Sequence, residues 1–415
     1  MGGIKFIINE VLGGYYFLVM SFIFGCCVSC KQTVNNIDKT DSKNIKILNE
    51  NTILSISLDE IIDSVSYIAL ETKECLLENI EVVKRDEERL FIKDKNRLLV
   101  FDSNGKFISQ ISNIGDAPHE YLYIQGFYLD KKNKCVCIIS YPDKKLLQYS
   151  YDGDFISYIN NLPEDISCIS SAMCLANDSL IVYNALSNDI NTRISEYTLY
   201  LNNPNKVEIK PLIKGIDNKS DKIHYPFIYR PMTFLGNKLY IISALSNIVY
   251  KFEKGVLTET FRIGLVNLTP PVSLLKDNEE LNFFSLKNVV KEEGYGLGIT
   301  GISTIDSCLI LHLDNYKTLI TDCNEGILVG SNIYDKNTNV YLSNLFTSGI
   351  SEDYLGFYDA SYLLDIKEYI MQNGNTQLKD ILRTLTEENN PVVFQYHFKK
   401  ELFSLLKSLV EKNRL

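Results

Sequence analysis

The sequence predicts an all-β protein, a six-bladed β-propeller of four-stranded antiparallel blades with a few helical insertions and a C-terminal helix. Two observations predict this fold: a four-stranded unit recurs every ~40 to 50 residues, and both ends of the chain contain strands that can close a ring. Composition agrees, because 45% hydrophobic side chains in 415 residues can bury a large core, and 11% aromatic residues are typical of β-sheets.

The clearest copies of the repeated unit are residues 101–111 and 149–159, whose first residues are 48 positions apart. In both copies an Asn-Gly or Asp-Gly pair, Asn104-Gly105 or Asp152-Gly153, separates two strands. Such pairs supply the positive φ angles of a tight hairpin, and the residues that follow alternate between apolar and polar. A second hairpin lies upstream of each copy, so one unit contains about four strands.

Weaker copies follow, and together with the clear ones they approach six blades. They cover residues 166–201, 229–263 and 299–334. The two ends of the chain supply further strands, at residues 53–58 and 64–70 and again at residues 391–398. We expect the first strands to pair with the last in a single blade, since this removes the exposed edges of an open array.

Three stretches are predicted to be helical: residues 273–293, 362–385 and 400–412. The last stretch has leucines at helical spacing, namely Leu402, Leu405, Leu406 and Leu409. This apolar stripe favours packing onto the propeller itself, with docking onto a partner as the alternative.

The N-terminus predicts export and lipidation. An apolar run over residues 11–25 leads to Cys30, which follows the small residue Ser29, and the chain then becomes polar. Cys26 is a weaker candidate because the large Phe24 lies two positions before it. The predicted organisation is a lipoprotein signal peptide over residues 1–30 with a lipidated Cys30, a flexible tether over 31–50, the propeller over 51–398 and an amphipathic helix over 399–415. An uncleaved membrane helix over residues 11–29 is the alternative.

Cysteines and charge exclude several classes of partner. Seven cysteines follow the signal, an odd number, and Cys135 and Cys137 lie two apart in a predicted strand, where we interpret them as buried thiols. No second Cys or His pair lies near them to complete a zinc site, so no metal and no cofactor are predicted. A net charge of −10 without any Lys/Arg-rich run argues against nucleic acid as a partner.

Several segments resemble one known family, the six-bladed β-propeller lipoproteins of Bacteroides and its relatives. These segments are YIALET (67–72), VFDSNGKFI (100–108), IGDAPHEYLYI (114–124), LSNIVY (245–250) and NNPVV (389–393). The family signature Gly-x-Gly-Pro-x-Glu-Tyr is similar to residues 115–121, where Ala117 replaces the second glycine. The resemblance implies a propeller at the outer membrane, without an established activity. In lipoproteins of these bacteria, acidic residues close behind the lipidated cysteine favour display on the cell surface. Here the first acidic residue after Cys30 is Asp38, so the resemblance favours the periplasmic side.

Binding residues are expected on the connections that lead from the outer strand of one blade to the inner strand of the next. The candidate ligand-binding residues on these connections are His119, Glu120, Tyr121, His224, Tyr225, Tyr229, Arg230 and Tyr295. For each the alternative is a structural role, such as a carboxylate that accepts backbone N–H groups. No catalytic residue is identified.

Three functions remain open. The first is a non-enzymatic binding module, tethered to the membrane by lipid, for a saccharide, a peptide or an envelope protein. The second is a propeller enzyme at the channel mouth, either a metal-dependent lactonase-like hydrolase or a lyase. The third is an interaction subunit of an envelope complex.

Overall fold

The protein is described by a computed structural model. The described residues are 43–45, 54–86, 88–141, 143, 145–159, 168–175, 179–186, 197–203, 208–214, 230–243, 245–278, 281, 283–313, 318–323, 328–341, 346–347 and 353–412. The predicted signal peptide, with Cys30, lies outside them.

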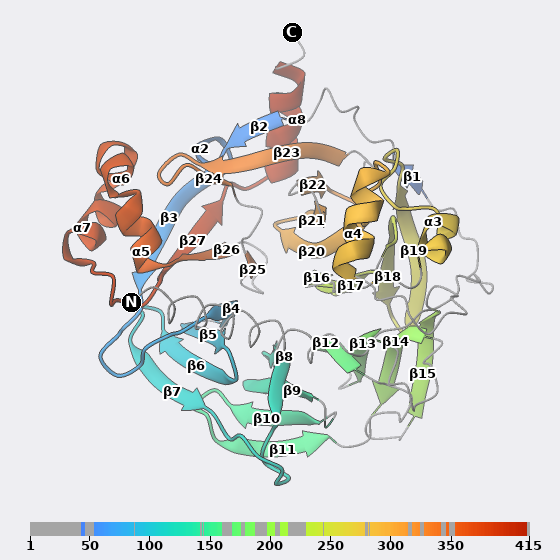
Figure 1. Cartoon of the computed structure of the whole chain (residues 1–415), viewed down its shortest axis with the longest axis horizontal. Helices are drawn as coiled ribbons and strands as arrows, with labels where there is room; N and C mark the ends of the chain where they lie inside the picture. The colour runs from blue at the N-terminus through green and yellow to red at the C-terminus, as the bar shows by residue number, and fades with distance from the viewer. Residues whose placement is uncertain are drawn as a thin grey trace, which may run out of the picture.

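Six antiparallel sheets form a closed ring, which confirms the predicted six-bladed propeller (Figure 1). The first three blades are each continuous in sequence. They consist of β4 (Ile80–Asp86), β5 (Arg89–Asp94), β6 (Arg97–Asp102) and β7 (Phe107–Ile111); β8 (Tyr123–Asp130), β9 (Cys135–Tyr141), β10 (Leu146–Ser150) and β11 (Phe155–Ile159); and β12 (Cys168–Cys174), β13 (Leu180–Leu186), β14 (Tyr197–Asn203) and β15 (Glu208–Lys214).

The fourth and fifth blades each carry an additional strand from the N-terminal segment. Their own strands are β16 (Met232–Leu235), β17 (Lys238–Ile242), β18 (Ile248–Glu253) and β19 (Val256–Ile263), then β20 (Ile299–Ile305), β21 (Cys308–Leu313), β22 (Thr318–Thr321) and β23 (Leu328–Asp335), with the short β24 (Val340–Tyr341) beside β23. β1 (Lys43–Ile45) pairs in parallel with β19, and β2 (Leu54–Ser57) pairs in parallel with β23. The N-terminal segment therefore covers the outer edges of two blades.

The sixth blade combines the two ends of the chain, as predicted. β25 (Phe346–Thr347), β26 (Asp353–Tyr358) and β27 (Val392–Phe398) come from the C-terminal part, and β3 (Ile62–Ala69) pairs with β27 as the outer strand. The expectation that residues 53–58 also join this blade is wrong, because β2 lies on the fifth blade. The innermost strands contact one another around the axis, as β8 contacts β12, β16 contacts β20, and β25 contacts β4.

The two repeated hairpins exist, but their turns differ from the predicted geometry. Gly105 and Gly153 have φ of 85° and 99°, whereas Asn104 and Asp152 do not have positive φ. The Gly105 N–H donates to the Asp102 carbonyl at 3.0 Å, and the strand register shifts between Val100 and Phe101. One glycine with positive φ followed by a bulge matches a longer hairpin loop built around a type I turn.

The core lies between the blades. Because side chains alternate along a strand, β5 places Leu90 and Ile92 against the sixth blade and Phe91 against the second. The central sequence of β5, Leu-Phe-Ile, is therefore apolar on both faces. Cys135 and Cys137 pack between the second and third blades as buried free thiols, with their Sγ atoms 4.0 Å apart. This confirms their interpretation as buried thiols.

Helices lie in the three predicted stretches, and a further short helix, α2, lies at residues 58–61, where no helix was predicted. They are α2 (Leu58–Ile61), α3 (Val272–Asp277), α4 (Phe283–Glu292), α5 (Ala360–Asp365), α6 (Lys367–Asn373), α7 (Thr376–Thr384) and α8 (Leu402–Lys412). α8 buries Leu402, Phe403, Leu406 and Val410 in the same cluster as Ile56 and Ile61, so it packs onto its own propeller. None of the described helices is long and apolar enough to cross a bilayer.

Gly298 fixes the return from α4 into the fifth blade, and we expect Gly298→Ala to lower the free energy of unfolding by about 3 kcal/mol. Its φ is +83°, and a Cβ there would lie 2.8 Å from the Ser246 carbonyl oxygen. Gly294→Ala is the matched control, because Gly294 has a φ of +78° but open space around it, so only about 1 kcal/mol is expected. Urea unfolding measures both losses, and equal losses would show that the close approach to Ser246 is unimportant.

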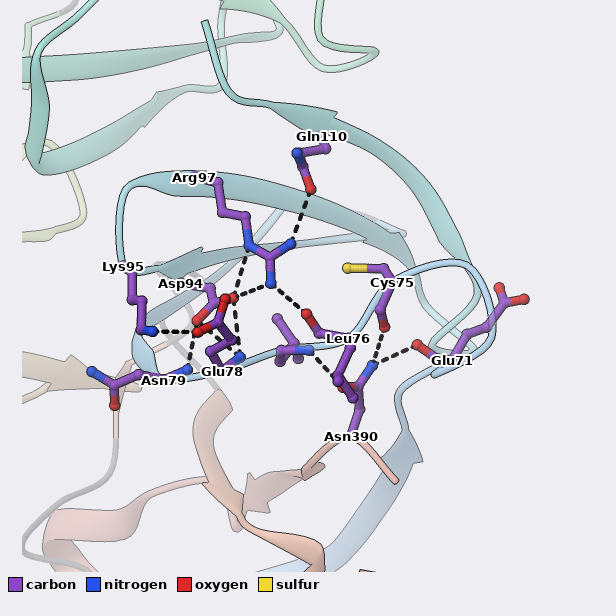
Figure 2. A network of polar contacts seen from close by, with 11 residues as sticks. Glu71, Cys75, Leu76, Glu78, Asn79, Asp94, Lys95, Arg97, Gln110 and Asn390 are labelled. Carbon is purple, nitrogen blue, oxygen red and sulfur yellow. Dashed lines mark hydrogen bonds and ion pairs between the residues drawn. The ribbon is translucent and has the colours of Figure 1, made fainter. Parts of the chain in front are cut away.

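A polar network closes the ring where the sixth blade meets the first (Figure 2). Asn390, just before β27, bonds three backbone groups of the link between β3 and β4. On the side of the first blade, the fully buried Asp94 accepts the Asn79 N–H at 2.6 Å and the Arg97 Nε–H at 2.9 Å. The link between β3 and β4 is thus held by side chains from both blades.

Candidate functional site

Lys84 lies beside the propeller axis, on the innermost strand of the first blade. Its Nζ donates to the Phe127 carbonyl at 2.7 Å and lies 5.0 Å from the centroid of the Phe127 ring. Phe127 belongs to β8, the innermost strand of the second blade. The Lys84 side chain therefore links the innermost strands of two neighbouring blades.

Positive charges surround Lys84. Burial first, and then the charges of Arg230 and Lys131, lower the pKa of Lys84 to about 8. No carboxylate of the described chain forms an ion pair with its ammonium group; Lys131 itself pairs with Asp86, at 3.6 Å. A buried cation whose neighbouring charges are also cations is costly, and such groups are concentrated at functional sites.

Arg230 connects Lys84 to the fifth blade. Its backbone bridges to Gly301, and its carbonyl accepts the Ile302 N–H at 2.9 Å, which ties the entrance of β16 to β20. Its charge lowers the pKa of Lys84 in the first blade and, after burial, contributes to lowering the pKa of His312 to about 3. The Arg230 charge therefore acts on Lys84 of the first blade and His312 of the fifth, while Arg230 itself precedes the fourth. In a propeller, a position near the axis is close to several blades at once.

His312 completes this group, on the second strand of the fifth blade. Its Nε2 lies 3.2 Å from the Ser303 hydroxyl, and its lowered pKa keeps the ring neutral near pH 7. Lys84 and His312 are enclosed by protein yet retain partial solvent exposure. His312 lines a small cavity with Ile333 of the fifth blade and Phe398 of the sixth. We call Lys84, Arg230 and His312 the axial cluster.

A second polar group, beside the first, is electrically balanced. Lys93 is 1% exposed, pairs with Glu81 and lies 5.2 Å from the centroid of the Tyr123 ring. Burial lowers the pKa of Lys93, whereas the Glu81 carboxylate opposes this shift. Burial also raises the pKa of Tyr123, with a contribution from Glu81. The Lys93 charge is thus compensated within the protein.

The predicted signature loop is held by its own contacts. Tyr121 is fully buried, and its hydroxyl lies 3.1 Å from the carbonyls of Asn96 and Ile111. Glu120 folds back so that its Oε2 accepts the Ala117 N–H at 2.9 Å and occupies the space where a Cβ of Gly115 would lie. These contacts describe a loop anchor.

His119 lies at the outer rim. Its side chain is 55% exposed, and its ring centroid is 6.0 Å from that of Phe155 on β11, the outermost strand of the second blade. The structure therefore does not bring His119 together with Arg230. Among the predicted residues that the structure describes, Arg230 is the one whose backbone bonds an innermost strand of another blade, β20.

The remaining predicted residues divide into two groups. The Tyr295 N–H donates to the Val290 carbonyl at 2.9 Å, and its side chain packs against the apolar cluster formed by α3 and α4. His224, Tyr225 and Tyr229 lie outside the described residues.

We expect Glu120→Ala to lower the free energy of unfolding by about 1 to 2 kcal/mol, because a charged acceptor of a backbone N–H is lost. His119→Ala is the control, one residue away and exposed, with an expected change within about 0.5 kcal/mol. Chemical denaturation of both variants checks this. An unchanged stability of Glu120→Ala would contradict the anchoring role.

Sequence reasoning missed Lys84 and His312. Lys84 follows Ile-Glu-Val-Val in a strand that also contains Arg85 and Asp86, so its charge is not unusual there. His312 lies in Cys-Leu-Ile-Leu-His-Leu and is a basic residue within an otherwise apolar strand. The sequence therefore marks His312 as unusual, but not Lys84. Their proximity to Arg230 follows from ring closure and strand position, which the sequence does not specify residue by residue.

The described chain holds no group of three or more His, Cys, Asp or Glu side chains arranged to hold a metal ion.

Comparisons with known proteins agree with this fold. The chain is similar to the crystal structure of a candidate exported protein from Bacteroides fragilis NCTC 9343, with a TM-score of 0.62 and 17% identity over 84% of this chain and 100% of that one. It is also similar to a member of the DUF4221 family from Bacteroides vulgatus ATCC 8482, with a TM-score of 0.50 and 8% identity over 81% of this chain and 97% of that one. None of the curated proteins compared with the chain matches it. At these identities the similarity shows the fold alone.

A family model described as a domain of unknown function, DUF4934, matches residues 42–397. This range spans all six blades, from the N-terminal edge strands to β27. The chain belongs to the DUF4934 family of six-bladed β-propellers.

Proposed function

We propose that the protein is a lipid-anchored propeller of the cell envelope that binds a ligand at its central channel without chemical conversion. The observation that carries the proposal is the axial cluster, in which three blades contribute basic side chains to one place. Arg230 offers a planar set of donors to an anionic or hydroxylated group, so a saccharide, a peptide or an exposed segment of an envelope protein fits this chemistry.

Export is supported by the fold relationship to a candidate exported protein of Bacteroides and by the N-terminal sequence. We propose that Cys30 carries the lipid and that the propeller faces the periplasm. Metabolic labelling with an alkyne fatty acid tests the anchor: Cys30→Ala should lose the label, whereas Cys26→Ala should keep it. Retention of the label by Cys30→Ala would overturn the assignment.

Ligand binding is tested by thermal shift of the full propeller against a panel of oligosaccharides and peptides. A compound that stabilises the wild type should not stabilise Arg230→Met, and it should still stabilise His119→Ala, whose side chain lies at the rim. A shift that survives in Arg230→Met but disappears in His119→Ala would place the site at the signature loop and contradict the proposal.

A further inference from the structure

A groove lies between β3 and α7, on the outer side of the sixth blade, where Figure 1 shows the helices α5 to α7. Its volume is about 640 Å³, which is within the usual range of ligand-binding sites. Tyr67 and Ala69 of β3 line one side, and the exposed Gln377 and Asp380 of α7 line the other. Asn104, on the turn between β6 and β7, also lines it. The groove is thus bounded by the edge of a strand and the face of a helix.

The free edge of β3 points into this groove. β3 is the outermost strand of the sixth blade, and its other edge pairs with β27. The Tyr67 carbonyl accepts the Gln377 Nε2–H at 3.2 Å, so the main chain of Tyr67 faces α7 and not β27. The main-chain groups of residues two apart face the same edge of an antiparallel strand, so those of Ala69 face outward as well. The Glu71 N–H continues this series, because it donates to the Gly105 carbonyl at 2.8 Å.

One main-chain donor on this edge is left open. The Tyr67 carbonyl and the Glu71 N–H have partners, whereas the Ala69 N–H between them has no hydrogen-bond partner within the described chain. Ala69 is exposed. A strand edge with an open N–H is a template for the addition of a further strand.

Other blades of this propeller show what such an edge binds. The outermost strands of the fourth and fifth blades each pair with a short extended segment, β1 on β19 and β2 on β23. Among the described residues, β3 has no strand on its outer edge. An extended main chain is therefore the structure that fits the groove, as it does on the two neighbouring edges.

The charge of the groove selects among extended segments. Of the described residues that line it, Asp380 is the acidic one, and none is a lysine or an arginine. Asp380 pairs with Arg383 on the same helix, but both side chains are more than half exposed, so this ion pair is weak. A basic side chain of an incoming segment would be attracted to the Asp380 carboxylate, and an acidic one would be repelled.

We propose that the groove binds an extended, basic segment of a partner protein, which adds a strand to β3. The segment accepts the Ala69 N–H with its main chain and places a lysine or arginine side chain beside Asp380. The Gln377 amide, which holds the Tyr67 carbonyl in the free protein, gives way to the incoming main chain. This site is separate from the axial cluster, because it lies on an outermost strand.

The probes are capped hexapeptides of Thr and Val in which one Lys occupies each position in turn, with twins that carry Glu in place of Lys. NMR titration of the propeller at low ionic strength should detect binding of at least one lysine peptide at millimolar concentration or below. Its glutamate twin should bind at least about tenfold more weakly. Hydrogen exchange of the Ala69 amide should slow by about tenfold or more when the peptide binds.

Ala69→Pro removes the outward N–H at a position where an edge strand tolerates proline, so peptide binding should fall by at least about tenfold. Ala69→Ser is the matched control, because it keeps the N–H and should bind as the wild type does. Asp380→Asn should weaken binding of the lysine peptide about threefold to fivefold, whereas Asp365→Asn, at an exposed acid on α5, should not. The unfolding transition of each variant confirms that it is folded.

Three results would overturn the inference: no binding of any lysine peptide, equal binding of the lysine and glutamate twins, or binding that Ala69→Pro retains. Binding of a neutral sugar such as maltohexaose in place of the peptides, with loss in Asp380→Asn, would assign the groove to a saccharide and overturn it too. The proposed channel ligand is tested separately by Arg230→Met, so these results do not depend on it.

Discussion

Asn390→Ala is expected to lower the free energy of unfolding by about 4 kcal/mol, the largest loss that we predict for a single polar side chain in this protein. Asn390 is 2% exposed and joins the entrance of β27 to the link between β3 and β4 (Figure 2). Since β3 and β27 come from opposite ends of the chain, this residue supports the closure of the ring.

The size of the effect follows from three hydrogen bonds, two of them buried and one part-buried. The Asn390 side chain donates to the carbonyls of Glu71 and Cys75, both at 2.6 Å, and accepts the Leu77 N–H at 2.8 Å. Alanine would leave these groups without their partner, and an unsatisfied buried polar group costs about 1 to 3 kcal/mol.

Asn389→Ala is the matched control, because Asn389 precedes Asn390 and is only partly buried. It accepts the Thr386 N–H at 2.7 Å, so a loss of about 1 kcal/mol is expected. Urea denaturation followed by tyrosine fluorescence compares the two variants. Equal losses would show that the Asn390 network does not hold the closure.

Lys84→Met is expected to stabilise the protein by about 2 kcal/mol at pH 7, in contrast to most substitutions of buried residues. The lowered pKa of Lys84, about 8 against an ordinary 10.5, corresponds to about 3 kcal/mol of unfavourable burial of the charge. The lost contacts with Phe127 offset about 1 kcal/mol of the gain. A residue that costs stability and is needed for binding is the expected sign of a functional site.

The pH dependence has a defined sign. Between pH 8 and 10.5 the unfolded chain holds the Lys84 proton more than the folded protein does, so the wild type gains stability from this group as pH rises. The advantage of Lys84→Met should therefore be full below pH 8 and should shrink toward pH 10.5. Urea unfolding of both proteins at pH 7 and pH 10 measures it. An advantage that does not change with pH, or a destabilised variant, would contradict this description of Lys84.

Much of the fold could be predicted because its determinants are local. The alternation in residues 101–111 and 149–159 and their glycines identify hairpins, and the period of the repeats identifies blades. Strands 64–70 and 391–398 were expected to pair, and they do as β3 and β27. The blade that β2 joins could not be predicted, because a short strand of this kind can pair with any uncovered blade edge equally well.

The site was harder to predict because it depends on side-chain direction. Arg230 was selected for its place on a connection between blades, and the same reasoning selected His119, whose side chain lies near Phe155 on an outermost strand. Glu120 and Tyr121 look like binding residues in the sequence, but Glu120 accepts a backbone N–H of its own loop and Tyr121 donates to backbone carbonyls of the first blade. Lys84 and His312 lie on strands, whereas the sequence analysis looked for binding residues on the connections between blades.

Titration of the Lys84 amine tests most directly whether the closed ring gathers cations at its axis. NMR of the propeller with carbon-13-labelled lysine, with the Lys84 signal assigned by its loss in Lys84→Met, measures the pKa. Arg230 and Lys131 are the charged groups that act on this amine. The structure predicts a pKa near 8, which should rise toward its ordinary value in Arg230→Met. A pKa near 10.5 in the wild type, unchanged by Arg230→Met, would contradict the axial cluster.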